Sequence, residues 1–428
     1  MNMYRSIGLL VRSVHGALSL CIAASFAFAD ANIQELSIDD AVRHALTSDP
    51  DIHSLRLLAD AQGRLKEAAK HLPDPTLRTG FMNVPLDSFA LNREPMTQAL
   101  IGFRQRIPAI GSRSASSTNH EHLSQVFNHR TSLQEKNITR DTRIVWLEAH
   151  YQRHAVDLTS QALELLESLS HVVRARYAAG DELQLAVVAA ELELSKLQSR
   201  LIETKQREVQ TLDELQRLLG VMNGVSIGHK LPNWDAAPAR EGVQDSLKAH
   251  PRVQAADSVV AAEAAMTRLF ETALKPEWHI DLSYGIRSGA NLDGDARSDF
   301  ASATLSFSLP LLAKQKHNLR LLASQANEDN ARHSKAKILR DMTAEIAVAY
   351  SEWGQLSERL DLLNETIVAQ SDNHAQAALK AYQNKEGTFT DVLLSYVNEV
   401  DANLEQHRVK IDRLKAWATI DSLNGSTK

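Results

Sequence analysis

The chain has 428 residues and a net charge of −6, with 47 Lys and Arg against 53 Asp and Glu, so no basic field attracts nucleic acid. Glycine (17), proline (11) and aromatic residues (5%) are sparse, which is typical of long helices and not of a compact α/β enzyme. The sequence contains no glycine-rich phosphate loop, serine nucleophile elbow or zinc-protease motif. We therefore expect no enzyme activity, no catalytic residues and no cofactor.

The N-terminus has the pattern of an export signal. Arg5 and Arg12 are followed by the apolar stretch 16–26 and by Ala27-Phe28-Ala29, a small-x-small cleavage pattern. Cleavage after Ala29 would make Asp30 the first mature residue and residues 1–29 a signal peptide. The alternative is a membrane anchor, but the apolar run is shorter than the roughly 20 residues that span a bilayer.

The single cysteine, Cys21, lies inside this segment. A lipid-modified cysteine would follow a small residue, whereas Leu20 precedes this one. Lipidation is the minor alternative, and removal of Cys21 would leave a mature chain without thiol or disulfide chemistry.

Each half of the remaining chain begins with an expected helix. The first runs from Asp39 to His71, with Ser37 as its N-cap, and ends before Pro73. The second runs from Gly242 to Ala273 and ends before Pro276.

Four stretches after these helices alternate apolar and polar residues, as half-buried strands do, the first of them less clearly than the others. They are 76–84, 98–107, 277–287 and 300–309, with polar loops 85–95 and 288–298 between them. Each has about the length that crosses a bilayer at a tilt. A water-soluble sandwich is the alternative. Four strands cannot close a membrane barrel and open edges are not tolerated in lipid, so spanning strands would require several chains to share one barrel.

Long helices follow each strand pair. Residues 111–176 and 313–381 each allow a helix of roughly 100 Å, and the second carries a sustained apolar stripe at spacings of three and four. The shorter helices of each half, placed end to end, would match one long helix. This is the geometry of a tubular wall.

The two halves repeat each other in sequence. Matched residues are separated by 201 positions near the start of each half and by 205 near its end, a drift that small loop insertions would cause. The pairs include Pro50 with Pro251, Pro75 with Pro276, Tyr177 with Tyr382 and Val187 with Val392. We therefore expect a first repeat at 30–220, a linker or equatorial segment at 221–240 and a second repeat at 241–428.

With these features the sequence resembles the TolC-type outer-membrane efflux family over essentially the whole mature chain. Within it, the sequence is similar to the heavy-metal (CzcC/CusC-like) branch, although Ser112 stands where that branch has lysine. The residues that carry this resemblance are Leu72-Pro73-Asp74-Pro75, Gly80, Asn83-Val84-Pro85, Met96-Thr97, Gln105-Arg106-Ile107-Pro108 and Gly111-Ser112-Arg113.

The resemblance implies a mainly α fold with a small β part. Each chain of a homotrimer would give four strands to a shared transmembrane β-barrel and its helices to a periplasmic tunnel. It implies an outer-membrane channel that works with a periplasmic adaptor and an inner-membrane proton-driven pump, exporting heavy-metal cations. The alternatives are a channel for drugs or type I secretion, or a periplasmic coiled-coil adaptor without a pore.

The resemblance also assigns roles to the two helix turns. Tyr177 and Gly180 in the first and Gly387 in the second are similar to tip turns that contact the adaptor, with Lys385 in the usual place of the second glycine. Tyr382 and Asp391 resemble gate residues, and three copies of Asp391 would form an anionic ring.

Other gate residues of the family are replaced here. Leu394 and Ala186 stand where the family has acids, and Gly387 stands in the place of the tyrosine's arginine partner. For Asp391, the alternative to the ring is an ordinary acid at a helix start.

No metal site is expected. His150 and His154 have a helical i, i+4 spacing, but no thiol or carboxylate cluster in the sequence completes a site. We expect them to be solvated helix histidines.

Overall fold

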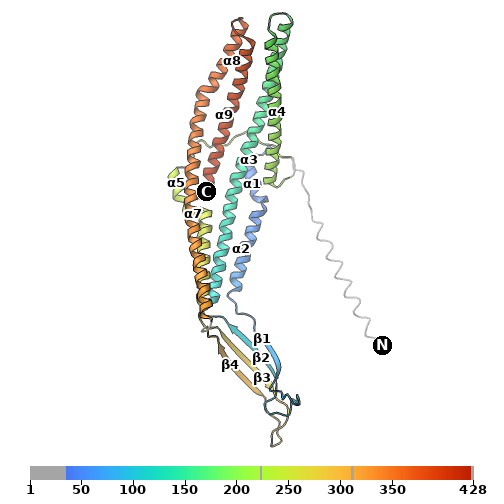
Figure 1. Ribbon diagram of the computed structural model, residues 1–428, viewed down its shortest axis with the longest axis vertical. Helices are drawn as coiled ribbons and strands as arrows, with labels where there is room; N and C mark the ends of the chain where they lie inside the picture. Colours follow the sequence, from blue (N-terminus) through green and yellow to red (C-terminus); the bar gives the residue numbers. More distant parts are fainter. Residues whose placement is uncertain (1–34, 222–223, 310–312, 426–428) are drawn as a thin grey trace, which may run out of the picture.

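The computed structural model describes residues 35–221, 224–309 and 313–425. These residues form an elongated molecule with a helical region above a small sheet (Figure 1). Ala29, Asp30 and Cys21 lie outside the described residues, so export and cleavage stay predictions.

The described part of the chain is mainly helical and contains the same succession of elements twice, as predicted. The first half comprises helices α1 (Ile38–Ser48) and α2 (Pro50–Ala68), strands β1 (Thr76–Met82) and β2 (Gln98–Ile107), and helices α3 (Ser112–Ala178) and α4 (Gln184–Leu219). The second comprises α5 (Arg240–Asp245), the 3₁₀ turn η1 (Ser246–Ala249), α6 (Pro251–Thr272), β3 (Trp278–Ile286), β4 (Phe300–Phe307), α7 (Lys314–Leu362), the π turn η2 (Leu363–Ile367), α8 (Val368–Gln383) and α9 (Phe389–Leu423).

Three predicted helices contain interruptions that the sequence analysis missed. The expected helix 39–71 is divided at Asp49, whose carboxylate accepts from the Ile52 amide at 2.8 Å and caps α2. Pro50 lacks an amide hydrogen, so it suits the first turn of a new helix. The expected helix 242–273 is divided in the same way before Pro251. The π turn η2 interrupts the third, the expected helix 313–381.

The helices form a wall in which two shorter stretches of helix, one after the other, lie beside each long helix. α3 packs against α1 and α2 along its first part and against α4 along its last part, so short helices run beside one long helix as expected (Figure 1). α6 packs on α3 and α7, and α9 packs on α3, α7 and α8. Ser37 caps α1 as predicted, since its hydroxyl accepts from the Asp40 amide at 3.2 Å.

The largest buried side chain anchors the middle of this wall. Trp146 of α3 is fully buried, and its indole nitrogen donates to the Leu36 carbonyl oxygen at 3.0 Å. Of the helices described, none is both long enough and apolar enough to cross a membrane.

The four strands form one antiparallel sheet in the order β1-β2-β3-β4. β2 and β3 come from different halves of the chain and pair over the whole of β3, with Gly102 opposite Ser283. A side chain at Gly102 would lie 2.8 Å from the Leu282 carbonyl oxygen, so glycine permits this close approach. The sheet therefore joins the two halves at one end of the molecule.

Candidate functional site

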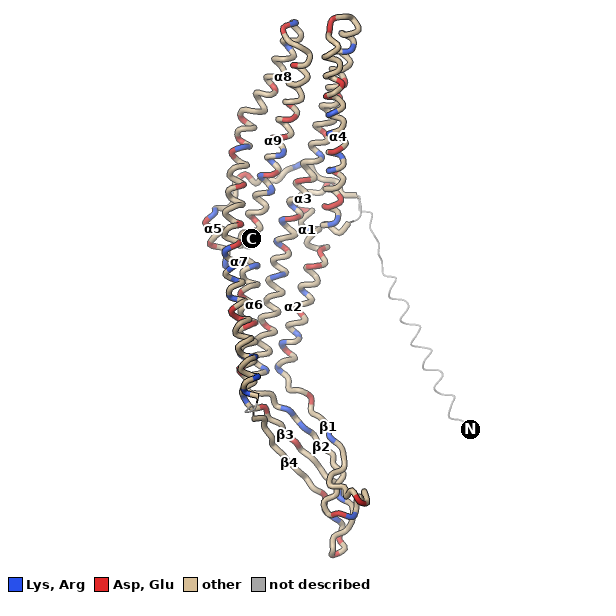
Figure 2. The backbone as a smooth tube through the Cα atoms, in the orientation of Figure 1, with Lys and Arg blue, Asp and Glu red and all other residues tan. Residues whose placement is uncertain are grey.

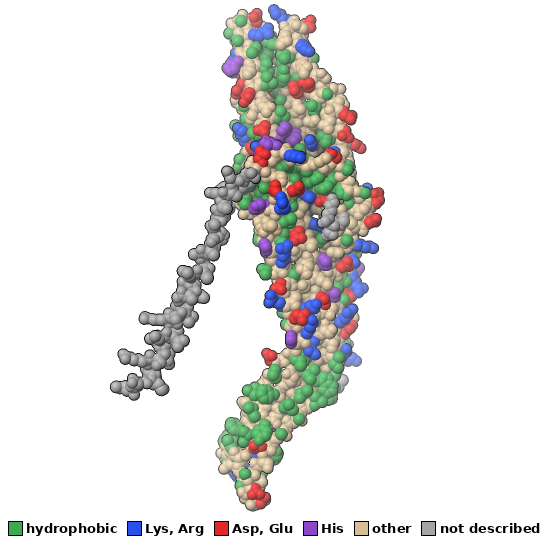
Figure 3. Space-filling model, turned by 180° about the vertical axis from the view of Figure 1, so that it is seen from behind, with side chains coloured by type: hydrophobic (Ala, Val, Ile, Leu, Met, Phe, Trp, Pro, Cys, Tyr) green, Lys and Arg blue, Asp and Glu red, His purple; other side chains and the backbone are tan. Residues whose placement is uncertain are grey.

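The two faces of the sheet differ in chemistry. The register places apolar side chains from all four strands on one face, many of them exposed in the single chain, and Figure 3 shows hydrophobic side chains gathered over the strands. These residues are Leu77, Ile101, Phe103, Ile280, Leu282, Tyr284, Leu305 and Phe307.

The opposite face carries charged pairs. Arg104 and Arg78 donate to one carboxylate oxygen of Asp281 at 2.7 and 3.1 Å, and Arg106 makes two hydrogen bonds to Glu277 at 3.0 and 2.7 Å. Charged residues are fewer on the strands than along the helices (Figure 2). Such a sheet can face hydrocarbon on one side and water on the other.

At the far end of the molecule, the two helix turns share one backbone geometry. Gly180 and Lys385 both have left-handed φ angles, of 81° and 64°. Their amides donate to the carbonyl oxygens of Tyr177 and Tyr382 at 3.0 and 3.1 Å. The next amide in each turn closes a second bond at 2.9 and 2.8 Å, the pattern of a Schellman helix end. Lys385 therefore occupies the usual glycine position without changing the turn.

Lys385→Gly should stabilise the second turn. A residue with a β-carbon costs about 1 kcal/mol in the left-handed conformation, whereas glycine adopts it freely. Glycine's greater freedom in the unfolded chain offsets part of this gain. We expect a thermal unfolding midpoint higher by a degree or less, given the length of the chain. Gly180→Ala, the matched change in the first turn, should lower the midpoint. A stabilising Gly180→Ala would contradict this account.

The glycine two residues later has a steric role. A β-carbon at Gly387 would lie 3.2 Å from the Ala381 β-carbon, so this position lets the turn fold back closely on α8.

Thr388 is the N-cap of helix α9, and Asp391 completes the cap from within the first turn. The Thr388 hydroxyl accepts from the Asp391 amide at 3.2 Å, and the Asp391 carboxylate accepts from the Thr388 amide at 3.1 Å and from its hydroxyl at 2.7 Å. This is a capping box, and the hydrogen bonds from Thr388 hold the pKa of Asp391 below its usual value. The side chain is exposed at the tip. The equivalent residues of the first turn, Leu183 and Ala186, provide no side-chain cap.

Tyr382 connects the two tips. Its hydroxyl donates to a Glu182 carboxylate oxygen at 2.9 Å, and the Arg176 guanidinium lies over its ring at 4.7 Å from the centroid. Burial, together with the Glu182 carboxylate, raises the pKa of Tyr382. Neither partner was predicted from the sequence, where only Gly387, in the place of the family's arginine, was considered as a partner position for Tyr382. Tyr177, at the equivalent position in the first turn, is 46% exposed.

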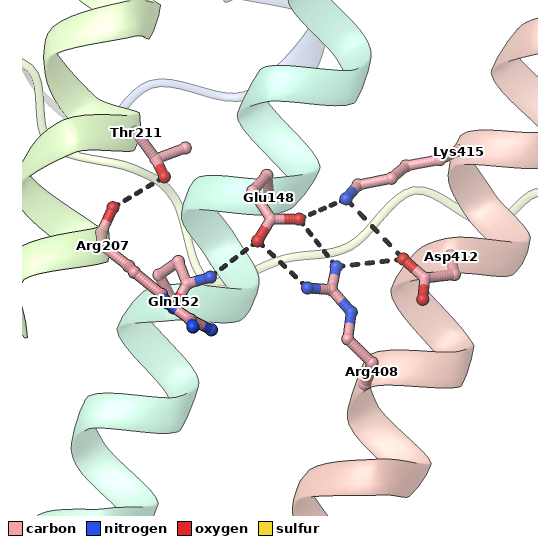
Figure 4. A network of polar contacts seen from close by, with 7 residues as sticks. All are labelled: Glu148, Gln152, Arg207, Thr211, Arg408, Asp412 and Lys415. Carbon is pink, nitrogen blue, oxygen red and sulfur yellow. Dashed lines mark hydrogen bonds and ion pairs between the residues drawn. The ribbon is translucent and has the colours of Figure 1, made fainter. Parts of the chain in front are cut away.

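A second connection between the halves lies farther from the tips, between α3 and α9 (Figure 4). Glu148 accepts from Arg408 at 3.0 and 2.7 Å, from Gln152 at 2.7 Å and from Lys415. Asp412 lies 3.0 Å from Arg408. Burial opposes ionisation of Glu148, but the hydrogen bonds from Arg408 and Lys415 outweigh it and lower its pKa to about 2. No sequence motif identified this cluster.

The histidine prediction is wrong in part. His154 is exposed, but His150 is half-buried and both lie close to His407 of α9. Within residues 35–221, 224–309 and 313–425, no three His, Cys, Asp or Glu side chains are placed to hold a metal ion.

Comparison with solved structures gives the same fold for several channel proteins. The outer-membrane channel OprN aligns at TM-score 0.77 and 16% identity, covering 91% of this chain and 90% of that one. CusC aligns at TM-score 0.77 and 14% identity, with 91% and 92% covered. The outer membrane protein VceC from Vibrio cholerae aligns at TM-score 0.75 and 15% identity, with 91% and 97% covered.

Comparison with family sequences matches only part of the chain. Residues 242–426 match the family described as "Outer membrane efflux protein". None of the curated proteins searched matches the chain. The family match bears out the predicted outer-membrane location. The matched family is one of efflux proteins, and OprN and CusC are described as channels, in line with the expectation of no enzyme activity. The second half of the chain thus matches the outer membrane efflux protein family in sequence, and the described chain as a whole has the fold of outer-membrane channel subunits.

Proposed function

We propose that the chain is one subunit of a trimeric outer-membrane channel in a tripartite efflux system. The sheet carries this proposal. One face is apolar, the other holds ion pairs, and the outer edges of β1 and β4 have no strand partner among the residues described. An open edge in hydrocarbon would leave backbone groups unsatisfied, so closure requires further copies of the sheet. Three copies would give twelve strands.

The helical wall supports the other half of the proposal. Its length beyond the sheet suits a tunnel that extends into the periplasm, with the helix turns at the far end. We assign residues 30–220 and 241–428 to the two repeats, with 221–240 between them as a linker or equatorial segment. Tyr177, Gly180 and Gly387 lie in the turns that would contact a periplasmic adaptor, which in turn would join an inner-membrane proton-driven pump.

Heavy-metal cations are our proposed cargo, supported by the segment from Leu72 to Arg113 that resembles the heavy-metal branch. Drug export or type I secretion is the alternative within the family. A periplasmic adaptor without a pore is disfavoured by the exposed apolar face of the sheet. A deletion strain should become sensitive to metal cations and not to drugs, and the reverse pattern would refute the proposed cargo.

Assembly and conduction test the channel itself. Native mass spectrometry of the detergent-purified protein should give a trimer, and the trimer should conduct ions in a planar bilayer. Replacement of Leu282 by Asp on the apolar face should abolish insertion, whereas Ser283→Asp on the opposite face should not. A stable monomer that conducts, or a protein soluble without detergent, would refute the proposal.

Asp391→Asn should lower the cation preference of the channel. Three carboxylates around the axis would attract cations more strongly than a surface pair, because a narrow pore has a lower effective dielectric constant than bulk water. We expect reduced selectivity in reversal-potential measurements and weaker block by multivalent cations. Thr388→Ala, which weakens the same cap without removing the charge, is the matched control. It should leave selectivity unchanged and cost about 1 kcal/mol of stability.

The capping box gives Asp391 an alternative role, in which it only stabilises the start of helix α9. If Asp391→Asn changes stability but neither selectivity nor block, then Asp391 acts only as a helix-start residue.

A further inference from the structure

Three imidazoles meet where the two halves of the chain pack together. His150 and His154 lie one turn apart on α3, and His407 lies on α9. The ring centroid of His407 is 4.0 Å from that of His154 and 5.5 Å from that of His150. The Tyr151 ring lies nearly parallel to that of His407, with the ring centroids 6.0 Å apart. Figure 3 shows histidine side chains on the visible surface of the helical region.

The contact suits uncharged rings. His407 Nε2 and His150 Nδ1 are buried without a hydrogen-bond partner among the described residues, so no carboxylate is placed to stabilise a proton on either nitrogen. His150 Nε2 lies 3.1 Å from the His229 carbonyl oxygen. Rings this close pack favourably when neutral, but like charges at this distance would repel.

The surrounding charges also disfavour protonation. Lys410 and Arg408 of α9 add positive charge near the cluster, and the backbone of His229, in the segment after α4, lies against His150. Asp157 of α3 acts on His154 in the opposite direction. The acid nearest to Arg408, Glu148, is already paired with that arginine and with Lys415.

The pKa directions agree with this geometry. Burial, followed by the charges of His154 and His150, lowers the pKa of His407 to about 3. Partial burial also lowers the pKa values of His150 and His154, although the His154 side chain keeps contact with solvent. All three rings are therefore neutral at neutral pH while α3 and α9 remain packed.

We propose that His150, His154 and His407 form an acid-sensitive contact that holds α3 against α9 while the rings are neutral and releases the two helices when the rings take up protons. The contact lies between α3 and α9, and each of these helices has one end at a tip turn. Its consequence for the channel, easier separation of the tips at acid pH, rests on the proposed function.

The pH window follows from linkage. In the separated state the rings have ordinary pKa values of about 6.5, whereas in the packed state their pKa values are lower. The separated state therefore binds more protons, and the packed state loses stability as pH falls below about 6.5. Each imidazole can change the equilibrium by up to about tenfold per pH unit.

Distance measurements test the contact without requiring conduction. Spin labels can be attached to cysteines introduced by Ser168→Cys in α3 and Asn373→Cys in α8, both exposed positions. Cys21 is the sequence's only cysteine, so Cys21→Ser in the same chain leaves no other labelling site. In trimers diluted with unlabelled chains, double electron–electron resonance should show a longer distance between the labels on α3 and α8 at pH 5 than at pH 7.5. Channel conductance should rise over the same range.

The variants identify the cause. His407→Phe keeps an aromatic ring but cannot take up a proton, so it should remove most of the pH-dependent change in distance. Lys410→Gln removes a repelling charge and should move the transition to lower pH. His171→Gln, at an exposed histidine of the same helix, is the control and should behave as the unmodified chain does.

Two results would overturn the proposal: distances that do not change with pH, or an unchanged transition in a folded His407→Phe chain. If the distances respond to pH but the protein does not conduct, the contact stands and the channel assignment fails. If His407→Phe does not fold, Lys410→Gln decides, because an unshifted transition there would also refute the proposal.

Discussion

Glu148→Leu should lower the free energy of unfolding by about 3 kcal/mol, a large effect for a single residue. The substitution leaves Arg408 and Lys415 partly buried at the α3–α9 contact without their shared carboxylate, and only Asp412 remains beside them. The Glu148 side chain is 24% exposed, so solvent screens these charges only in part. Losing one partner of such a pair costs more than the pair contributes, because unpaired charges stay desolvated.

The same cluster predicts a pH dependence. The pKa of Glu148 is about 2 in the folded chain and ordinarily 4.5. The folded state therefore binds fewer protons, so the stabilisation is fully present above about pH 4.5 and is lost as pH falls towards 2. A difference of this size corresponds to about 3 kcal/mol, in agreement with the effect expected for Glu148→Leu. In the variant, stability should change less over this range.

Thermal unfolding in detergent, followed by circular dichroism, measures both effects. Glu203→Leu is the matched control, since Glu203 pairs with Arg207 on the surface of α4 with both side chains about 60% exposed. It should change stability by less than about 0.5 kcal/mol. The double variant Glu148→Leu/Arg408→Leu should recover part of the loss. Equal effects of Glu148→Leu and Glu203→Leu would show that the cluster contributes no more than a surface pair.

Tyr382→Phe should shift the proposed channel towards its open state. The hydroxyl of Tyr382 donates to Glu182 of the other tip, so its removal breaks the hydrogen bond between the two turns but keeps the ring beneath Arg176. A hydrogen bond to a charged acceptor contributes about 1.5–3 kcal/mol, and partial exposure reduces this to about 1. Over three chains the sum is about 3 kcal/mol, or roughly a hundredfold in the ratio of open to closed channels.

Single-channel recordings of the purified trimer give this ratio directly. Glu182→Gln should have a smaller effect in the same direction, because an amide still accepts a hydrogen bond but carries no charge. Tyr177→Phe is the control, since this tyrosine occupies the equivalent position in the first turn and is exposed. An intact Tyr382→Phe trimer with the same open probability as the unmodified channel would show that this contact does not hold the tips closed.

Local sequence patterns predicted the elements well. The two-residue alternation of 98–107 depends only on neighbouring residues, and β2 occupies the same range in the structure. Ser37 caps α1 for the same local reason. The two halves also agree at the turns, where Lys385 has the same left-handed backbone conformation as Gly180 although its side chain differs. The ends of the helices were predicted less well. The divisions before Pro50 and Pro251 depend on whether a cap residue ends one helix or the helix continues through it.

By itself, the sequence determined the duplicated order of helices and strands, the two chemical faces of the sheet and the turns at the far end, since periodicity, caps and prolines act over a few residues. Only the tertiary structure decided which charged and aromatic groups meet. Glu182 lies 200 residues from Tyr382, Glu148 lies 260 from Arg408, and His407 reaches His150 across the same contact. These partners depend on how α3, α8 and α9 pack, and the pKa values that follow depend on the burial and charge that packing creates.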